Sequence, residues 1–153
     1  MTNLHESRII KNKDKILEAE LCYKIQGAIY NIANKYGIGL KEQIYQKALI
    51  EEFTKQGLKF EPQKRINIYS IDTGKRLGAY VPDFVIENKI VLEIKSSSFT
   101  TRQDVSQQRS YLKASTHEIA YLVNFGTNKV DIRRSIYTNN RKPFITQLIN
   151  NPN

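Results

Sequence analysis

The sequence predicts one mixed α/β domain of the α+β class, in which a central mixed sheet is flanked by helices. Apolar residues recur at helical spacing over residues 14–36 and about 41–56. Residues 60–96 and 118–136 instead carry short apolar or alternating stretches separated by turn residues, which is typical of strands. A third helical stretch, about residues 103–115, lies between the two strand regions, so the expected order of elements is ααβββαββ.

Glycines mark the ends of the first two helices. Gly37 and Gly39 follow the first helix and Gly57 follows the second, and glycine is favoured just beyond a helix end. On the first helix, Tyr23 and Tyr30 are interpreted as core or boundary aromatics. On the second helix, the expected inward-facing residues are Ile44, Ala48, Leu49 and Phe53.

Turn residues divide most of the remaining chain into strands. The expected strands cover residues 60–71, 78–86, 89–96, 118–125 and 129–136. The turn Asp72-Thr73-Gly74 follows the first strand, and a short turn around Asn88 joins the second strand to the third. The last two strands flank the turn Gly126-Thr127-Asn128.

Length and composition are those of a single folded domain. The chain has 153 residues, of which 40% are hydrophobic, and it contains only 7 Gly and 4 Pro, which argues against a disordered or fibrous protein. We expect the domain to cover residues 14–137. A flexible basic N-terminus (1–13) would precede it, and a basic, Asn-rich tail (138–153) would follow it.

The sequence also predicts a soluble, cytoplasmic protein. No apolar stretch approaches the roughly 18 residues that a membrane span needs, and the first residues lack the apolar core of a secretory signal. The single cysteine, Cys22, cannot form an internal disulfide, and its apolar helical surroundings predict a buried side chain.

An excess of positive charge gives the first indication of function. The chain carries 24 Lys and Arg against 15 Asp and Glu, a net charge of +9. Such an excess favours a polyanionic partner, either nucleic acid or an anionic membrane surface. Charge alone does not distinguish such a partner from a basic surface that only confers solubility, so the choice depends on the motifs.

The segment from Tyr80 to Ser96 carries the candidate chemistry. If its hairpin is symmetric about Asn88, the register pairs Asp83 with Glu93 on one face of the sheet. A shift of one residue would set Asp83 against Ile94 and place a carboxylate on the apolar face, which is unfavourable. The symmetric register is therefore predicted.

Two opposed carboxylates need a physical reason, because like charges with Cβ atoms roughly 5 Å apart destabilise a sheet. A divalent cation such as Mg²⁺, which prefers carboxylate oxygens, would supply one. Lys95 lies on the same face as Glu93, and two acids with a lysine around a hard cation suit phosphodiester hydrolysis. The alternative is an exposed strand with an ordinary Glu-Lys pair and an unrelated Asp, since short patterns of this kind also arise by chance.

Four motifs, in the expected order, resemble those of the PD-(D/E)XK nuclease superfamily. Pro82-Asp83 followed by Glu93-Ile94-Lys95 resembles the signature of that superfamily. Gly39-Leu-Lys-Glu-Gln-Ile-Tyr45 resembles the GxxExxY motif of one branch, and Gln107-Gln-Arg-Ser-Tyr111 resembles the QxxxY helix of RecB-like exonucleases. Residues 121–126 resemble the strand that closes the core in GxxExxY proteins.

This resemblance, which spans about residues 20–137, implies a restriction-endonuclease-like αβββαβ core and a nuclease that depends on Mg²⁺ or Mn²⁺. By position, Asp83 and Glu93 would be the main metal ligands, and the main-chain carbonyl of Ile94 would add a further oxygen. Lys95 would be the catalytic lysine, which orients the attacking water or stabilises charge.

Three other residues receive roles from the same resemblance. Glu42 would be an additional acidic group that binds metal directly or through water. Without the resemblance, a carboxylate in the first turn of a helix is explained by its favourable interaction with the helix dipole. Gln107 would support the site, and Tyr111 would lie near the substrate or pack beneath it.

Basic side chains are expected to bind the nucleic-acid backbone beside this site. They lie around the helix that carries Gln107 and on the last strand: Arg102, Arg109, Lys113, Arg133 and Arg134. Backbone contacts of this kind are non-specific and salt-dependent. No helix-turn-helix or zinc-finger pattern is visible, so no strong base-specific readout is expected.

The preferred interpretation is therefore a metal-dependent nuclease, with DNA favoured over RNA as its substrate. The alternatives are a non-cleaving nucleic-acid-binding module with the same fold and a structure-selective, junction-resolving endonuclease, which would be expected as a homodimer. The residues do not decide between exonuclease and endonuclease action, between one metal ion and two, or between biological pathways.

Overall fold

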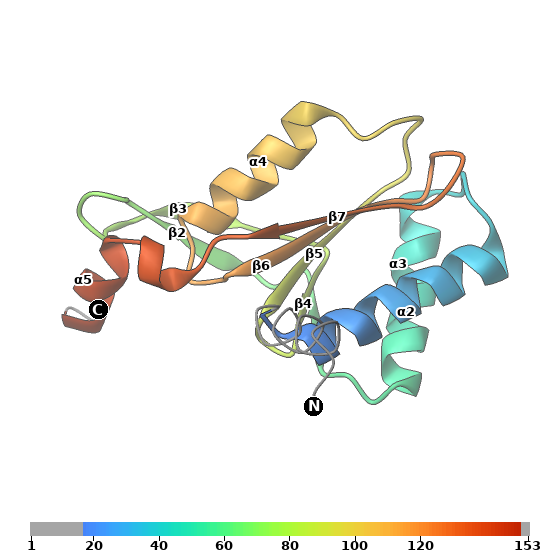
Figure 1. Ribbon diagram of the computed structural model, residues 1–153, viewed down its shortest axis with the longest axis horizontal. Coiled ribbons are helices and arrows are strands. Elements are labelled where there is room, and N and C mark those ends of the chain that lie inside the picture. The colour runs from blue at the N-terminus through green and yellow to red at the C-terminus, as the bar shows by residue number, and fades with distance from the viewer. Residues whose placement is uncertain (1–16, 151–153) are drawn as a thin grey trace, which may run out of the picture.

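A five-stranded mixed sheet forms the centre of the computed structural model, which describes residues 17–150 (Figure 1). The strands, in their spatial order, are β1 (Phe60–Pro62), β4 (Phe84–Ile86), β5 (Ile90–Lys95), β6 (Ile119–Asn124) and β7 (Asp131–Ile136). Only the pairing of β5 with β6 is parallel, and the connection between these two strands contains helix α4 (Arg102–Lys113). The predicted class, a mixed sheet flanked by helices, is confirmed.

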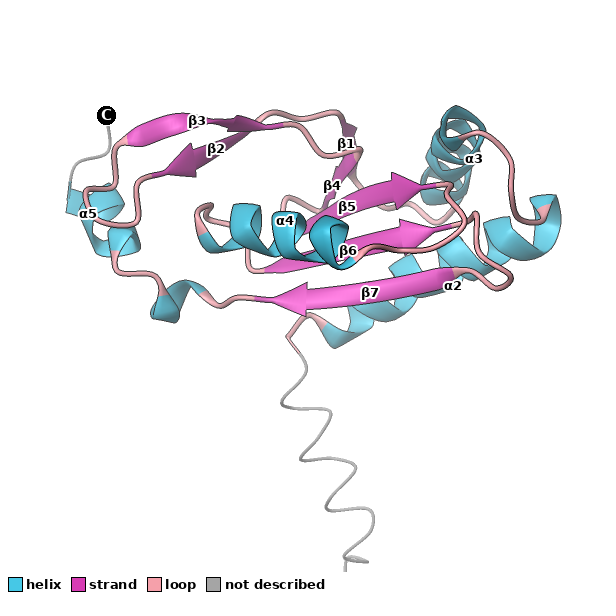
Figure 2. Cartoon of the chain, turned by 90° about the horizontal axis from the view of Figure 1, so that it is seen from above, coloured by secondary structure: helices cyan, strands magenta, loops and turns pink. Residues whose placement is uncertain are grey.

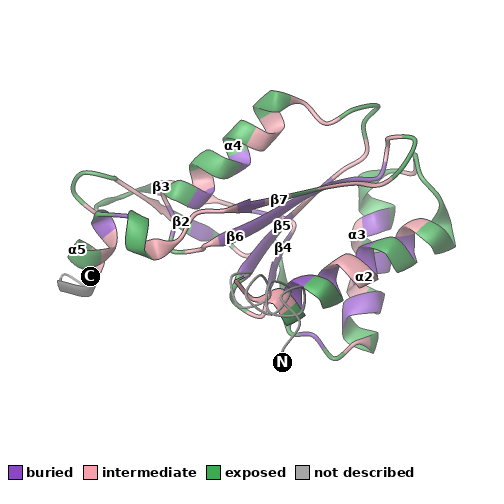
Figure 3. Ribbon diagram, viewed as in Figure 1, coloured by how far each residue is buried: buried purple, intermediate pink, exposed green. Residues whose placement is uncertain are grey.

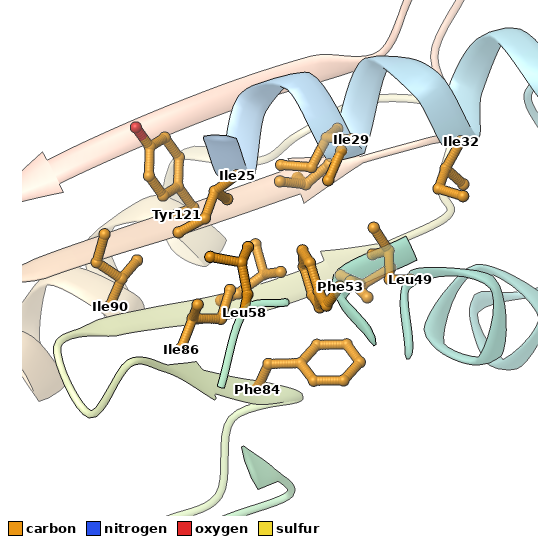
Figure 4. Packing of buried hydrophobic residues seen from close by; sticks show 14 of the residues in the cluster. Ile25, Ile29, Ile32, Leu49, Phe53, Leu58, Phe84, Ile86, Ile90 and Tyr121 are labelled. Carbon is orange, nitrogen blue, oxygen red and sulfur yellow. The ribbon is translucent and has the colours of Figure 1, made fainter. Parts of the chain in front are cut away.

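Helices cover both faces of this sheet. Helices α2 (Ala19–Tyr36) and α3 (Glu42–Lys55) pack on one face, and α4 lies on the other (Figure 2). The face under α2 and α3 holds the larger apolar cluster (Figure 4), which includes Ile25, Ile29, Ile32, Leu49, Phe53, Ile86, Ile90 and Tyr121. A smaller cluster under α4 contains Ile66, Val85, Val91, Leu112 and Ala120.

The alternation of side chains along the strands explains why both faces are apolar. Successive residues of a strand point to opposite faces, so Ile90, Leu92 and Ile94 belong to the larger cluster, whereas Val91 belongs to the smaller one. Strand β6 is buried along its whole length, as a strand covered on both faces must be (Figure 3).

The predicted register of the central hairpin is confirmed. Strands β4 and β5 pair Phe84 with Leu92 and Ile86 with Ile90, which is the symmetric arrangement about Asn88. Asn88 has a positive φ of 55°, a backbone conformation that asparagine tolerates better than most residues and that suits a tight turn. Asp83 precedes the first paired residue of β4, so its expected partnership with Glu93 falls just beyond the ladder.

Two of the predicted strands were wrong in extent. Residues 60–71 form β1 and then β2 (Ile66–Tyr69), and residues 78–86 are divided between β3 (Arg76–Tyr80) and β4. Strands β2 and β3 pair with each other in a separate two-stranded sheet, here called the β2–β3 hairpin. The chain leaves the main sheet at Gln63, whose φ is 50°, and returns to it after Pro82, which has no N–H to donate to a ladder.

Helix periodicity gave the inner face of α3 only in part. Ala48, Leu49 and Phe53 are buried as predicted, but Ile44 is 44% exposed and Tyr45 is fully buried in its place. The Tyr45 ring stacks on Phe125 with centroids 4.1 Å apart, and its hydroxyl donates to the carbonyl of Gly37 at 2.8 Å. The Tyr45 hydroxyl therefore has a hydrogen-bond partner that an isoleucine could not use.

Helix α2 also differs from the prediction at two aromatic residues. Tyr23 and Tyr30 are 80% and 50% exposed, so their interpretation as core or boundary residues was wrong. Both tyrosines lie on the outer side of α2, whose inner side buries isoleucines. Cys22 is buried, as predicted.

The segment after Tyr137, expected as a tail, contains a short 3-10 helix η1 (Asn139–Arg141) and helix α5 (Phe144–Asn150). Phe144 is fully buried and stacks on Tyr69 of β2, with ring centroids 5.7 Å apart. The Lys142 ammonium donates to two main-chain carbonyls, including that of Ser115 at 2.8 Å. This segment therefore supports the β2–β3 hairpin, beside which α5 lies in Figure 2.

The sequence also predicted a flexible N-terminus and no membrane-spanning segment. The N-terminus predicted to be flexible, residues 1–13, lies outside the described residues. Among the helices of residues 17–150, none combines the length and the apolar character needed to cross a bilayer.

Candidate active site

The motif residues meet where three elements approach the same part of strand β5. Glu93 and Lys95 project from β5 toward the α4 side, and Asp83 lies in the link that enters β4. Glu93 and Lys95 line a small cleft of about 50 Å³. The other residues that line this cleft are Tyr80, Asp104, Gln107, Gln108, Tyr111 and Leu122.

Asp83 is held through both of its carboxylate oxygens. Its Oδ1 accepts a hydrogen bond from Nε2 of Gln46, 2.7 Å away on α3, and its Oδ2 accepts one from the main-chain N–H of Ile94 at 2.6 Å. Burial raises the pKa of Asp83 despite these two bonds, and the negative charge of Glu42 acts in the same direction. The aspartate is thus oriented firmly but kept in surroundings that penalise its charge.

Glu93 is held by a hydrogen bond from a tyrosine. The hydroxyl of Tyr80, at the end of β3, donates to its Oε1. Burial raises the pKa of Glu93 to about 7, and the nearby Asp83 charge adds to the increase, whereas the Tyr80 bond and Lys95 oppose it. Burial also raises the pKa of the Tyr80 phenol, so Tyr80 is the donor in this bond at neutral pH.

The donor atoms of this site fit a hard divalent cation. Asp83 and Glu93 are half-buried carboxylates, and the negative charge of Asp83 raises the pKa of Glu93. A carboxylate that accepts one or two hydrogen bonds still has lone pairs that can bind a cation. Oxygen ligands of this kind are those that Mg²⁺ and Mn²⁺ prefer. Within residues 17–150, no group of three or more His, Cys, Asp and Glu side chains is close enough to hold a metal ion, so the fit is to a pair of carboxylates.

Glu42 is near this pair without joining it. It is the first residue of α3 and is exposed, and its charge raises the pKa of both Asp83 and Glu93. Gln46, one turn further along α3, makes the direct contact with Asp83 instead. The helix therefore approaches the site with Glu42 at its rim.

Lys95 supplies positive charge next to the two acids. Its charge opposes the increase in pKa of both Asp83 and Glu93, although the described part of the chain gives it no ion pair with either carboxylate. The ammonium is half-buried at the end of β5 and faces the cleft. This position suits contact with an anionic group that enters the cleft.

The QxxxY pair lies on the α4 wall of the cleft. Gln107 is exposed at the surface of α4 but lines the cleft with Glu93, and Tyr111 lies one turn later. The Tyr111 ring stacks on Tyr80, with centroids 4.2 Å apart and planes 8° from parallel. The neighbouring Gln108 is buried and donates to the carbonyl of Tyr121 at 2.8 Å, which fixes α4 on β6.

Sequence reasoning missed two residues that contact the acids, Gln46 and Tyr80. Gln46 follows Glu42 by four positions, so helical spacing does place both on one face of α3. No such signal exists for Tyr80. If residues 80–83 continued one strand, the alternation of side chains would place Tyr80 and Asp83 on opposite faces. In the structure Tyr80 ends β3, which is separate from β4, and its hydroxyl reaches Glu93.

The basic residues expected to bind nucleic acid divide into two groups. Arg102, Arg109 and Lys113 are exposed on α4, and none of them is among the residues that line the cleft. Arg133 is exposed on β7 but forms an ion pair with Asp131 at 3.1 Å. Arg134 is half-buried and donates through Nη2 to the main-chain carbonyl of Leu17 at 2.9 Å, so its guanidinium is engaged away from α4.

Two acids and a lysine at one end of the sheet, beside a helix with a glutamine and a tyrosine, make up the candidate active site. The sequence matches the model of the PD-(D/E)XK nuclease superfamily over residues 19–135, and the chain belongs to that superfamily. Membership implies a nucleic-acid substrate, phosphodiester hydrolysis and, as is typical of these nucleases, the use of divalent metal ions.

Comparison with individual proteins adds one solved structure. The chain is similar to an alkaline exonuclease (LHK-Exo) from Laribacter hongkongensis, with a TM-score of 0.44 and 11% sequence identity. The similarity covers 88% of this chain and 81% of the exonuclease. No curated protein matches the chain.

Proposed function

We propose that this chain is a Mg²⁺- or Mn²⁺-dependent nuclease of the GxxExxY branch that hydrolyses phosphodiester bonds in DNA. The observation that carries the proposal is the pair Asp83 and Glu93, two half-buried carboxylates held by donors from other elements, with Lys95 beside them. Burying two negative charges next to each other does not stabilise a folded chain. The arrangement of these carboxylates is therefore best explained by a ligand of positive charge.

Asp83 and Glu93 would hold the cation, with the main-chain carbonyl of Ile94 as a further oxygen ligand. When bound, a divalent cation neutralises charge that develops on the phosphate and lowers the pKa of water. Gln46 and the N–H of Ile94 fix the Asp83 carboxylate, so its orientation is set before substrate arrives.

Lys95 would act on the reacting groups. Its ammonium faces the cleft from the same strand as Glu93, where it can orient the attacking water and stabilise negative charge on the phosphate oxygens. Gln107, on the opposite wall, has an amide that can donate to the same phosphate or water. Glu42 would act from the rim, through water.

The DNA backbone would lie across α4. Arg102, Arg109 and Lys113 are exposed there, and Tyr111 of the same helix lines the cleft. Exposed cations in contact with phosphates give affinity that falls steeply with salt and depends little on sequence. Arg133 extends this surface onto β7.

Cleavage of a substrate panel tests the proposal. Linear, circular, single-stranded and branched DNA, together with RNA, are incubated with the full chain in Mg²⁺, in Mn²⁺ and in EDTA. We expect cleavage of at least one DNA substrate with metal and none with EDTA. Salt-dependent DNA binding without product under either metal would instead identify a non-cleaving binding module, and selective cleavage of branched DNA would identify a structure-selective endonuclease.

Substitution of Lys95 assigns the activity to this site. Lys95→Ala, with folding checked by circular dichroism, should reduce the cleavage rate by at least about 100-fold, because it removes charge stabilisation at the phosphate. Lys24→Ala serves as the control, since Lys24 is exposed on α2, the helix on the other face of the sheet. Equal rates for Lys95→Ala and wild type would contradict the assignment.

A further inference from the structure

The two candidate metal-binding carboxylates are supported very differently. Asp83 has a partner for each oxygen, one of them a main-chain N–H that cannot move independently of β5. Among residues 17–150, the Tyr80 hydroxyl is the one group that hydrogen-bonds the Glu93 carboxylate, and it contacts Oε1 alone. The orientation of Glu93 therefore depends on a single side chain outside the PD-(D/E)XK motif.

A glutamate needs such a partner more than an aspartate does. Glu93 has one more rotatable bond than Asp83, so fixing its carboxylate costs more conformational entropy. Carboxylates that bind metals are usually oriented by hydrogen bonds from neighbouring groups, and loss of those groups weakens metal binding. The Tyr80 bond uses one lone pair of Oε1, so the Glu93 carboxylate keeps lone pairs for a cation while its orientation is fixed.

Tyr80 is itself fixed from several directions. Its ring stacks on Tyr111 of α4, and its backbone pairs with Ile66 in the β2–β3 hairpin. That hairpin is attached to the rest of the molecule by the N–H of Tyr69, which donates to the carbonyl of Ala114 at 2.8 Å, and by the stack of Tyr69 on Phe144. The phenol is thus presented to Glu93 by a supported structure.

We propose that Tyr80 is a positioning residue, whose hydroxyl holds Glu93 in the orientation that binds the divalent cation, and that the β2–β3 hairpin presents this tyrosine to the site. The inference rests on the proposed function, because it gives Tyr80 a role in the same metal centre. It gives the hairpin, which lies outside the central sheet, an indirect part in the chemistry, through Glu93.

Loss of this one hydroxyl leaves the hairpin attached. Ile66 is buried in the smaller core cluster, and the contacts of Tyr69 do not involve Tyr80. The Tyr80→Phe variant keeps the aromatic ring that stacks on Tyr111 and removes only the hydrogen bond to Glu93. It therefore separates a role in the metal centre from a role in folding.

Tyr69→Phe is the matched control. Tyr69 belongs to the same hairpin and also stacks on an aromatic ring, but its hydroxyl accepts a hydrogen bond from Asn67 near the surface and does not touch either acid. Both variants are purified as full chains, and their melting temperatures are compared with that of the wild type.

Three quantities are measured for each protein. Isothermal titration calorimetry with MnCl₂ and no nucleic acid gives metal affinity, fluorescence anisotropy in EDTA gives DNA affinity, and steady-state cleavage gives kcat and KM. We expect Tyr80→Phe to weaken Mn²⁺ binding by about 10-fold to 100-fold and to lower kcat at fixed metal concentration. DNA affinity and KM should be unchanged, and Tyr69→Phe should match the wild type throughout.

The outcomes distinguish this inference from the proposed function. If the wild type binds Mn²⁺ and cleaves DNA, and Tyr80→Phe does both equally well, the positioning role is wrong and the proposed function stands. A Tyr80→Phe chain that is unfolded by circular dichroism shows a structural role and also overturns the inference. A wild-type chain that neither binds Mn²⁺ nor cleaves DNA overturns both.

Discussion

The two faces of the central sheet differ in how much apolar surface they bury. The face under α2 and α3 is a continuous apolar cluster that joins both helices to β4, β5 and β6. The face under α4 has a much smaller cluster of Ile66, Val85, Val91, Leu112 and Ala120, and beyond it the strands carry Glu93 and Lys95. One face stabilises the fold, and the other uses part of its area for charged groups that oppose folding.

This difference follows from the alternation of a single strand. In β5, Ile90, Leu92 and Ile94 face α2 and α3, whereas Val91, Glu93 and Lys95 face α4. The strand can thus hold an acid and a lysine near its end because its other side is anchored in the larger cluster. Burial of Glu93 without full compensation is tolerated because stability is supplied on the opposite face.

The largest expected effect is on the stability of the α2–α3 face. Leu49 is fully buried in the larger cluster, and Leu112 is equally inaccessible but belongs to the smaller one. Leu49→Ala should lower the free energy of unfolding by about 3–5 kcal/mol, and Leu112→Ala by about 2 kcal/mol, because a small cluster near a cleft can relax around the cavity. Urea denaturation of both variants measures the difference, and equal losses would show that the faces do not differ.

A second effect is expected from removing a buried charge at the site. The pKa of Glu93 is raised from its ordinary 4.5 to about 7, so between these values the folded chain binds more protons than the unfolded chain. Stability of the metal-free protein therefore falls as the pH rises from about 4.5 to 7 and stays reduced above it. Glu93→Gln removes this loss, and it should stabilise the chain by about 1–3 kcal/mol at pH 8 and by little at pH 5.

Denaturation in EDTA at the two pH values measures this effect. Glu87→Gln is the control, because Glu87 lies at the hairpin turn, away from the cleft. A Glu93→Gln chain that is less stable than the wild type at pH 8 would mean that the carboxylate stabilises the fold, contrary to the comparison of the two faces.

The smallest expected effect concerns the outer surface of α4. Arg109→Ala should weaken DNA binding a few-fold at low salt and reduce the slope of log affinity against log salt by about 1, because one phosphate contact is lost. Lys24→Ala removes the same charge from α2 and should leave the slope unchanged. Fluorescence anisotropy over a salt series makes the measurement, and equal slopes for the two variants would place DNA elsewhere than on α4.

The elements that the sequence predicted well are those set by local periodicity. The register of β4 with β5 followed from the symmetry of residues about Asn88, and α4 agreed with the prediction within two residues at each end. The proximity of Asp83 to Glu93 followed from the same register, and the charge of Asp83 raises the pKa of Glu93. Those features depend on neighbours that are close in the sequence.

What the sequence missed depends on contacts between distant segments. The division of residues 78–86 between two sheets places Tyr80 against Glu93, and strand alternation alone predicts the opposite face. Tyr45, rather than Ile44, lies on the inner face of α3 because its hydroxyl donates to the carbonyl of Gly37 and its ring stacks on Phe125. Helical periodicity shows which residues are apolar, but it does not show which polar groups will form hydrogen bonds in the folded chain.

The most direct test of the central claim is single-turnover cleavage of a labelled DNA substrate by Glu93→Gln in Mn²⁺, beside the wild type and at saturating protein. The pair of carboxylates predicts a loss of rate of at least about 1,000-fold, in a variant that is as stable as the wild type or more so, because the substitution removes a metal ligand and a buried charge together. Cleavage by Glu93→Gln at the wild-type rate would contradict the assignment of this site as the catalytic centre.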